Sequence, residues 1–124
     1  MTKILVVDDD RRIALSLAVR LKQEGYEVLE ANDGVTAVKK AIEDTPDVVL
    51  LDISMPAGNG LIVAERLRDN VQTATLPIIF LTASKRKDLR EQAEQWGPVA
   101  FLEKPFDSEQ VLREVRKALQ VQWA

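Results

Sequence analysis

The chain has 124 residues, the size of one domain that can enclose a single hydrophobic core. Its 17 Lys and Arg residues and 20 Asp and Glu residues give a formal net charge of −3, which argues against direct nucleic-acid binding because that function needs a basic face. Cysteine and histidine are absent, which excludes disulfides, thiol chemistry and histidine-ligated metals. No apolar run approaches the roughly 20 residues of a bilayer span and no signal peptide is recognisable, so we expect a cytoplasmic protein that does not enter a membrane.

Five apolar runs typical of β-strands alternate with five segments of helical periodicity. The strands are predicted at residues 3–7, 26–30, 47–51, 77–82 and 99–102. Between them apolar residues recur every three or four positions, as in Ile13, Leu17 and Leu21, then Val35, Val38 and Ile42, then Leu61, Ala64 and Leu67, then Leu89, Ala93 and Trp96, and finally Val111, Val115 and Leu119. Alternating strands and helices form a parallel sheet with helices on both faces. The sequence therefore predicts a single α/β domain over residues 1–124, a doubly wound (βα)5 fold with a five-stranded parallel sheet, whose last four residues are expected to fray.

Glycine, proline and short polar residues mark where several of these helices stop or start. Gly25 is expected to end the first helix and Pro46 the second. Gly97-Pro98 is expected to end the fourth helix, and either Asp107 or Ser108 can cap the fifth. These boundaries agree with the apolar periodicity, so two independent signals give the same order of elements.

Three of the predicted strands end in side chains that can bind a cation or a phosphoryl group. Asp8 and Asp9 follow the first strand, Asp52 follows the third, and Thr82 ends the fourth. Because the carboxyl ends of parallel strands meet at one edge of a sheet, these groups are expected to lie together. Lys104, after the fifth strand, can reach the same edge with its ammonium group. The sequence therefore predicts a site for a metal ion and a phosphoryl group.

Each of these residues also has a purely structural interpretation. An acid after a strand is a common N-cap of the next helix, and Asp52 can be a turn residue, Thr82 a strand-end cap and Lys104 a solvated loop residue. Three consecutive acids, from Asp8 to Asp10, exceed what capping needs, and like charges this close raise one another's pKa unless a cation neutralises them. Mg²⁺ takes oxygen ligands and needs only one or two direct carboxylates. A carboxylate such as Asp52 can also act as a nucleophile toward phosphorus.

Five short segments together carry a more specific signal than any one residue. They are Val6-Val7-Asp8-Asp9, Leu50-Leu51-Asp52-Ile53-Ser54-Met55-Pro56, Asn59-Gly60, Leu81-Thr82-Ala83 and Phe101-Leu102-Glu103-Lys104-Pro105-Phe106. This pattern resembles the receiver (phosphoacceptor) domain of bacterial two-component response regulators, and the resemblance covers essentially the whole chain. It implies the flavodoxin-like strand order 2-1-3-4-5.

The resemblance assigns the metal site and the phosphorylated residue. It implies that Asp52 is phosphorylated, and that Asp8, Asp9 and Asp52 hold Mg²⁺ together with the backbone carbonyl of Ser54. Asp8 often acts through a water molecule in this family. Mn²⁺ is expected to substitute for Mg²⁺.

The resemblance also assigns the catalytic and switch residues. Lys104 and Thr82 are expected to contact the phosphoryl group, and Thr82 and Phe101 to change position once it is bound. Phe101 can equally be an ordinary core aromatic. The Lys104–Pro105 peptide bond is expected to be cis.

The function implied is phosphorelay signal transduction, in which a sensor histidine kinase or a histidine phosphotransfer protein donates the phosphoryl group. Such a domain catalyses its own phosphorylation and dephosphorylation and is not an enzyme with a separate substrate. The face built from the fourth helix, fifth strand and fifth helix is expected to contact a downstream effector domain or protein, or a second copy. Leu15 and Val19 lie off the apolar stripe of the first helix, as isolated exposed residues or as a docking face for the donor.

Two other functions and a related fold compete with this interpretation. Haloacid-dehalogenase-like phosphatases also carry two acids spaced like Asp8 and Asp10, but here Arg11-Arg12 follows in place of the expected Thr or Val, and Asp52 would have no role. A receiver fold that is never phosphorylated would not need the complete set of acids, hydroxyl and lysine. A flavodoxin would need a first loop rich in Ser, Thr and Gly to bind phosphate.

Overall fold

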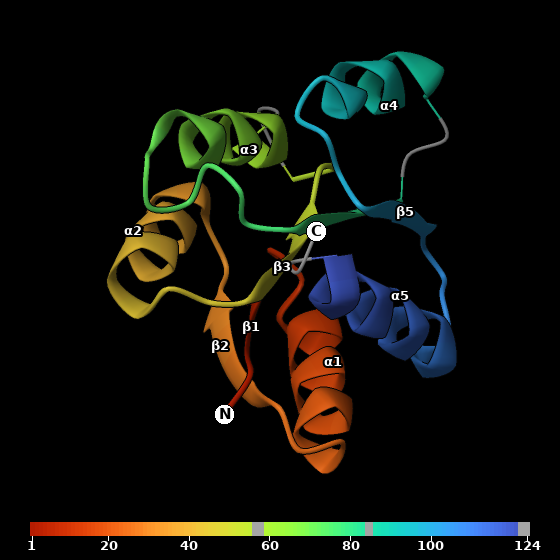
Figure 1. Cartoon of the computed structure of the whole chain (residues 1–124). Coiled ribbons are helices and arrows are strands. Elements are labelled where there is room, and N and C mark those ends of the chain that lie inside the picture. The colour runs from red at the N-terminus through yellow and green to blue at the C-terminus, as the bar shows by residue number, and fades with distance from the viewer. Residues whose placement is uncertain (56–58, 84–85, 122–124) are drawn as a thin grey trace.

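The computed structural model describes residues 1–55, 59–83 and 86–121. Along the chain (Figure 1) the elements are β1 (Lys3–Val7), α1 (Arg11–Gln23), β2 (Glu27–Ala31), α2 (Gly34–Asp44), β3 (Val48–Asp52), α3 (Asn59–Asp69), β4 (Ile78–Thr82), α4 (Lys87–Glu94), β5 (Ala100–Glu103) and α5 (Ser108–Val121). The strands form one parallel sheet in the order β2-β1-β3-β4-β5. This confirms the predicted α/β class and strand order. Fraying was predicted for residues 121–124, but Val121 is the last residue of α5, and Pro56 and residues 122–124 lie outside the described residues.

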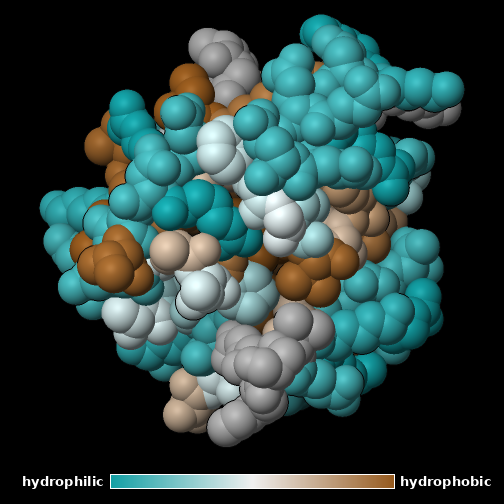
Figure 2. All heavy atoms as spheres, turned by 45° about the horizontal axis from the view of Figure 1, so that its top comes forward, coloured by the Kyte–Doolittle hydropathy of each residue, from teal (hydrophilic) through white to brown (hydrophobic). Residues whose placement is uncertain are grey.

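Helices cover both faces of the sheet (Figure 1), with α1 and α5 on one face and α2, α3 and α4 on the other. Successive residues of a strand point to opposite faces. Ile4 and Val6 of β1 therefore pack with α1 and α5, whereas Leu5 and Val7 pack with α2 and α3. The central strands β3 and β4 are buried throughout, which explains why their sequences are unbroken apolar runs. The face shown in Figure 2 is largely hydrophilic, with scattered apolar patches.

The predicted boundaries hold to within one residue, with one correction in the core. The strands β2 to β5 each begin one residue later than predicted, so Asp52 is the last residue of β3 and does not follow it. Gly25 follows α1 with a positive φ of 94°, as its predicted role as a helix stop requires. Val35, predicted to mark the buried stripe of α2, is 73% exposed. Ala37 and Ala41 face the sheet instead, and Val35 lies about 200° around the helix from Ala37.

Candidate functional site

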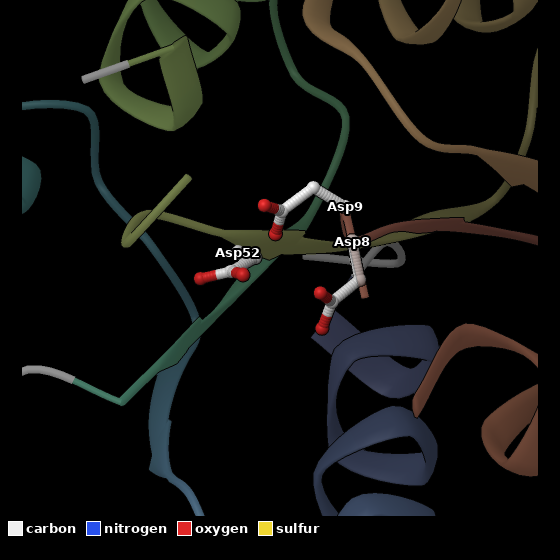
Figure 3. Close-up of side chains that lie close together, drawn as sticks. All are labelled: Asp8, Asp9 and Asp52. Atoms are coloured by element: carbon white, nitrogen blue, oxygen red, sulfur yellow. The ribbon is translucent and has the colours of Figure 1, made fainter. Parts of the chain in front are cut away.

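Three carboxylates converge at the carboxyl edge of the sheet (Figure 3). Asp8 and Asp9 follow β1, and Asp52 ends β3, its neighbour in the sheet. One carboxylate oxygen from each residue lies within 4.8 Å of the other two. Asp8 and Asp52 are buried, whereas Asp9 is exposed. Two buried acids and a third beside them concentrate negative charge where water can screen it only from one side.

Lys104 supplies a positive charge to this cluster. Its Nζ atom lies 2.8 Å from Oδ2 of Asp8 and 3.1 Å from Oδ2 of Asp52. The backbone of Lys104 follows β5, where its N–H donates to the carbonyl of Thr82 (2.8 Å), and the Lys104–Pro105 bond is cis, as the resemblance implied. One ammonium group therefore bridges two acids, and the four side chains together keep an excess of negative charge.

The pKa values of Asp8 and Lys104 are shifted by burial and by the contacts within this cluster. Burial raises the pKa of the Asp8 carboxyl, although the Lys104 ammonium and the N–H of Asp10 act in the opposite direction. Burial alone would lower the pKa of Lys104, but its contacts with Asp8 and Asp52 outweigh burial and raise it. Lys104 is thus firmly protonated, and Asp8 is an acid whose charge the protein does not fully compensate. A further cation bound nearby would stabilise the ionised form of Asp8.

Of the three consecutive acids Asp8, Asp9 and Asp10, only Asp10 caps a helix. Asp10 is the N-cap of α1, and its Oδ1 accepts from the N–H of Arg12 (3.0 Å) and of Ile13 (3.4 Å). Asp8 is held differently, since its Oδ1 accepts from the N–H of Asp10 (2.9 Å) and its carbonyl accepts from the amide of Asn32 (2.9 Å). Asp8 and Asp9 are therefore not needed as caps.

Asp52 is held at its side chain and at its backbone. Its Oδ1 accepts from the N–H (2.7 Å) and the hydroxyl (2.5 Å) of Ser54, and the Ser54 hydroxyl oxygen in turn accepts a long bond from the N–H of Ala83 (3.4 Å). On the other side Gly60 packs on the backbone, because a Cβ built there would lie 2.2 Å from the Asp52 carbonyl oxygen and 2.6 Å from the Cα of Ile53. Only glycine fits at this contact.

Thr82 and Phe101 belong to β4 and β5, the last two strands of the sheet. Thr82 is the buried final residue of β4, and β4 pairs with β3 so that Leu81 lies opposite Asp52. Phe101 of β5 is partly buried and packs on Phe80, with ring centroids 5.5 Å apart. Phe101 is therefore a core aromatic, whatever further role it has.

A groove of about 600 Å³ runs from this edge along α1. Its lining residues come from α1 and the segment after β5, and they are Asp10, Arg12, Ile13, Ser16, Leu17, Arg20, Lys104, Pro105, Phe106 and Ser108. On the outer surface of α1, Leu15 is 59% and Val19 is 49% exposed. Neither residue contacts the acidic cluster directly, but the groove connects the surface of their helix to Lys104.

Most of the residues predicted for the site lie together, and two that matter were missed. Asp8, Asp9, Asp52, Ser54, Thr82 and Lys104 share one edge of the sheet. The sequence predicted a role for the backbone carbonyl of Ser54, whereas the contacts observed for this residue come from its N–H and hydroxyl. Asn32 was missed, although a polar residue directly after β2 was a usable signal. The role of Gly60 against Asp52 was also missed, although it was part of a matched motif.

The fold and the acidic edge define a class of protein, and comparison with known families agrees. The family model of the response regulator receiver domain matches residues 4–116. The chain therefore belongs to the receiver domain family of two-component response regulators, which is consistent with phosphorelay signalling. Within the described residues no helix has the length and apolar character needed to cross a membrane.

Several known proteins are similar over nearly all of this chain. The DNA-binding dual master transcriptional regulator RpaA of Synechocystis sp. is 36% identical over 96% of the chain and 49% of its own length. Protein PilH of Pseudomonas aeruginosa is 33% identical over 96% of the chain and 98% of its own length. The crystal structure of a CheY-like receiver domain protein from Methanospirillum hungatei JF-1 matches with a TM-score of 0.91 at 25% identity, covering 98% of this chain and 96% of that one. The chain thus spans about half the length of RpaA but nearly the whole of PilH.

Proposed function

We propose that this chain is the phosphoacceptor of a phosphorelay and that Asp52 is the residue that carries the phosphoryl group. One observation carries the proposal: the buried Asp52 carboxylate shares the Lys104 ammonium with Asp8, within reach of the exposed Asp9. A structural ion pair needs one acid for each lysine. Three acids around one lysine are suited to a divalent cation and to a group that brings further negative charge.

The residues present fit Mg²⁺. Asp8, Asp9 and Asp52 offer the hard oxygen donors that this ion prefers, and we assign the backbone carbonyl of Ser54 as a further ligand, with Mn²⁺ able to use the same set. The raised pKa of Asp8 supports this assignment, because burial disfavours the ionised form of this carboxyl and a bound cation would stabilise it. When bound, the ion supplies positive charge to the oxygens of the phosphoryl group.

In the transfer step an oxygen of Asp52 attacks the phosphorus of a phosphohistidine or of a small phosphodonor. An O–P bond forms and the P–N bond of the phosphohistidine breaks, with its electron pair leaving on the imidazole, which is then protonated. With acetyl phosphate as the donor, the P–O bond to the acetyl group breaks instead and acetate leaves with the electron pair. Lys104 and Thr82 stabilise the charge that spreads over the three equatorial oxygens. Ser54 donates twice to Oδ1 of Asp52, whereas Lys104 donates once to Oδ2, so Oδ2 keeps a lone pair that can attack the phosphorus.

Water later attacks the phosphorus, breaks the O–P bond and returns Asp52 to its carboxylate with release of inorganic phosphate. The groups that support both reactions belong to this domain. We therefore propose a protein that catalyses its own phosphorylation and dephosphorylation, without turnover of a separate substrate.

The donor is proposed to be a sensor histidine kinase or a histidine phosphotransfer protein that docks along α1. Leu15 and Val19 are exposed there, and the groove beside them leads to Lys104. Leu15→Glu should slow transfer from the cognate donor and leave labelling by acetyl phosphate unchanged. Val71→Glu is the matched control, because Val71 is 92% exposed in the turn after α3. Equal loss with both donors in Leu15→Glu would reject the docking surface.

The output is proposed to be a shift between two arrangements of the α4-β5-α5 face. Thr82 and Phe101 move when the phosphoryl group is bound, and this face then engages an effector domain or protein, or a second copy of the chain. Phosphorylation can bias such an equilibrium only through contacts that differ between the two arrangements.

The central test is labelling with acetyl phosphate in Mg²⁺ followed by intact mass and peptide mapping. The expected product is one PO₃ group on Asp52, absent in Asp52→Asn and after removal of Mg²⁺ by a chelator. Asp69→Asn, which removes an exposed acid at the end of α3, should label like the parent. Labelling that persists in Asp52→Asn would assign the phosphoryl group to another residue and reject the proposal.

A further inference from the structure

One arginine joins α4 to β5 on the proposed output face. The guanidinium carbon of Arg90 lies 4.6 Å from the centroid of the Phe101 ring, and its Nη1 lies 3.8 Å from Oε1 of Glu103. Phe101 and Glu103 are two residues apart on β5, so their side chains point to the same face of the sheet. Arg90 therefore covers Phe101 with a cation–π contact and faces Glu103 with a longer ionic contact.

The contact is important because α4 is held to the rest of the domain by little buried surface. Among the residues of α4, all of which the structure describes, only Ala93 is buried, whereas α1 contributes four buried residues. Arg86, at the N-cap position of α4, makes no capping hydrogen bond with its side chain. A short helix with so few buried contacts is expected to shift or open easily. Arg90 thus adds a side-chain contact with β5 to the packing of Ala93 and Leu89 against the core.

The residues under Arg90 are also connected to the candidate site. In the ladder between β4 and β5, Glu103 pairs with Thr82. The next residue, Lys104, donates its N–H to the Thr82 carbonyl (2.8 Å) and its ammonium to the acids. A displacement of Thr82 or Lys104 therefore reaches Glu103, Phe101 and the Arg90 contact through a single strand pair.

We propose that Arg90 is a positioning residue that latches α4 onto β5 while Lys104 is paired with Asp52, and that this latch opposes the phosphorylated arrangement. The inference rests on the proposed function of Asp52. A cation–π contact of an exposed arginine corresponds to roughly a two- to fivefold change in an equilibrium constant. Removal of the guanidinium group should shift the protein toward the phosphorylated arrangement by that factor.

The test uses the full chain with Trp123→Phe, so that Trp96, two residues after α4, is the only tryptophan. Its fluorescence is titrated with beryllofluoride, a phosphoryl mimic, in the presence of Mg²⁺. Arg90→Ala should bind beryllofluoride about two- to fivefold more tightly than the parent, with Arg90→Lys in between. Arg66→Ala should match the parent, because Arg66 is an exposed arginine of α3 that forms no ion pair within the described part of the chain.

Hydrogen exchange without beryllofluoride tests the contact independently of the proposed function. The amides of α4 should exchange faster in Arg90→Ala and at the parent rate in Arg66→Ala. Unchanged exchange in Arg90→Ala overturns the latch. Unchanged or weaker beryllofluoride binding by Arg90→Ala, beside normal binding by the parent, also overturns it. Absence of binding by the parent at Asp52 rejects the proposed function, and the coupling fails with it, while the exchange result still decides whether the contact holds α4.

Discussion

The contact between Gly60 and the backbone of Asp52 predicts a large loss of stability for Gly60→Ala, although this substitution adds only one methyl group. The new Cβ would lie 2.2 Å from the Asp52 carbonyl oxygen, whereas ordinary contact begins near 3.4 Å. This oxygen and the Cα of Ile53, which would lie 2.6 Å from the new Cβ, are both backbone atoms, so no side-chain rotation can relieve the clash. The start of α3 and the end of β3 must separate by roughly 1 Å, and α3 is fixed in the core by Val63, Ala64 and Leu67. We expect a loss of about 3 kcal/mol in the free energy of unfolding, the upper end of the usual cost of overpacking.

Urea unfolding followed by circular dichroism measures this loss. With a typical m-value of about 2 kcal/mol/M, the midpoint should fall by roughly 1.5 M. Gly25→Ala is the control, because Gly25 has a positive φ of 94° but no heavy atom within 4 Å of the added Cβ. It should cost only about 1 kcal/mol for the left-handed backbone. A Gly60→Ala protein no less stable than Gly25→Ala would show that Asp52 is not clamped from this side.

Two further predictions concern the charges of the site. Lys104→Met should lower the rate of labelling by acetyl phosphate about 100-fold, because a cation that stabilises the transferred group is lost. Mg²⁺ titrations of the Trp123→Phe chain, monitored by Trp96 fluorescence, should show binding to Lys104→Met as tight as to the parent or tighter, because a competing cation has gone. Weaker Mg²⁺ binding would mean that Lys104 organises the acids and does not compete with the ion. In thermal unfolding the parent should be stabilised by about 2.7 kcal/mol when Mg²⁺ is at 100 times its Kd, and Asp9→Asn should lose most of this gain. Equal stabilisation of Asp9→Asn would remove Asp9 from the proposed ligand set.

The order of elements could be predicted from the sequence largely because the inner strands β1, β3 and β4 are covered on both faces. Burial on both sides forces unbroken apolar runs, and these are visible without any knowledge of tertiary contacts. The first residue of a strand is harder to predict, since it depends on the partner in the ladder. Pro77 illustrates this, because it belongs to the apolar run but has no N–H to give, and β4 begins at Ile78. The exposure of Val35 was unpredictable for a related reason, namely that the small residues of α2 face the sheet.

In the candidate site, too, some features could be predicted from the sequence and others could not. Asp8, Asp52, Thr82 and Lys104 could be assigned to one edge because the topology of a parallel sheet brings strand ends together. Their hydrogen-bond partners could not be assigned, since the Ser54 hydroxyl on Asp52 depends on the path of the loop after β3. Contacts between helices and strands, such as that of Arg90 with Phe101, require the position of α4 and leave no pattern in the sequence.

The charges at the site also explain why the proposed chemistry should be transmitted to the switch face. Three carboxylates and one ammonium leave two negative charges in excess, which one divalent cation would balance. Conversion of Asp52 to its acyl phosphate exchanges one negative charge for two, so the balanced site again lacks one positive charge. Polar donors must then supply the difference, and two of them belong to the end of β4 and the residue after it. Thr82 has its hydroxyl there, and the N–H of Ala83 makes only a 3.4 Å bond to Ser54, which it can exchange for a stronger acceptor. Movement of these donors toward the phosphoryl group would pull on the strand pair that supports Arg90. The demand for charge at one edge of the sheet would then also be the force that opens the proposed latch on α4.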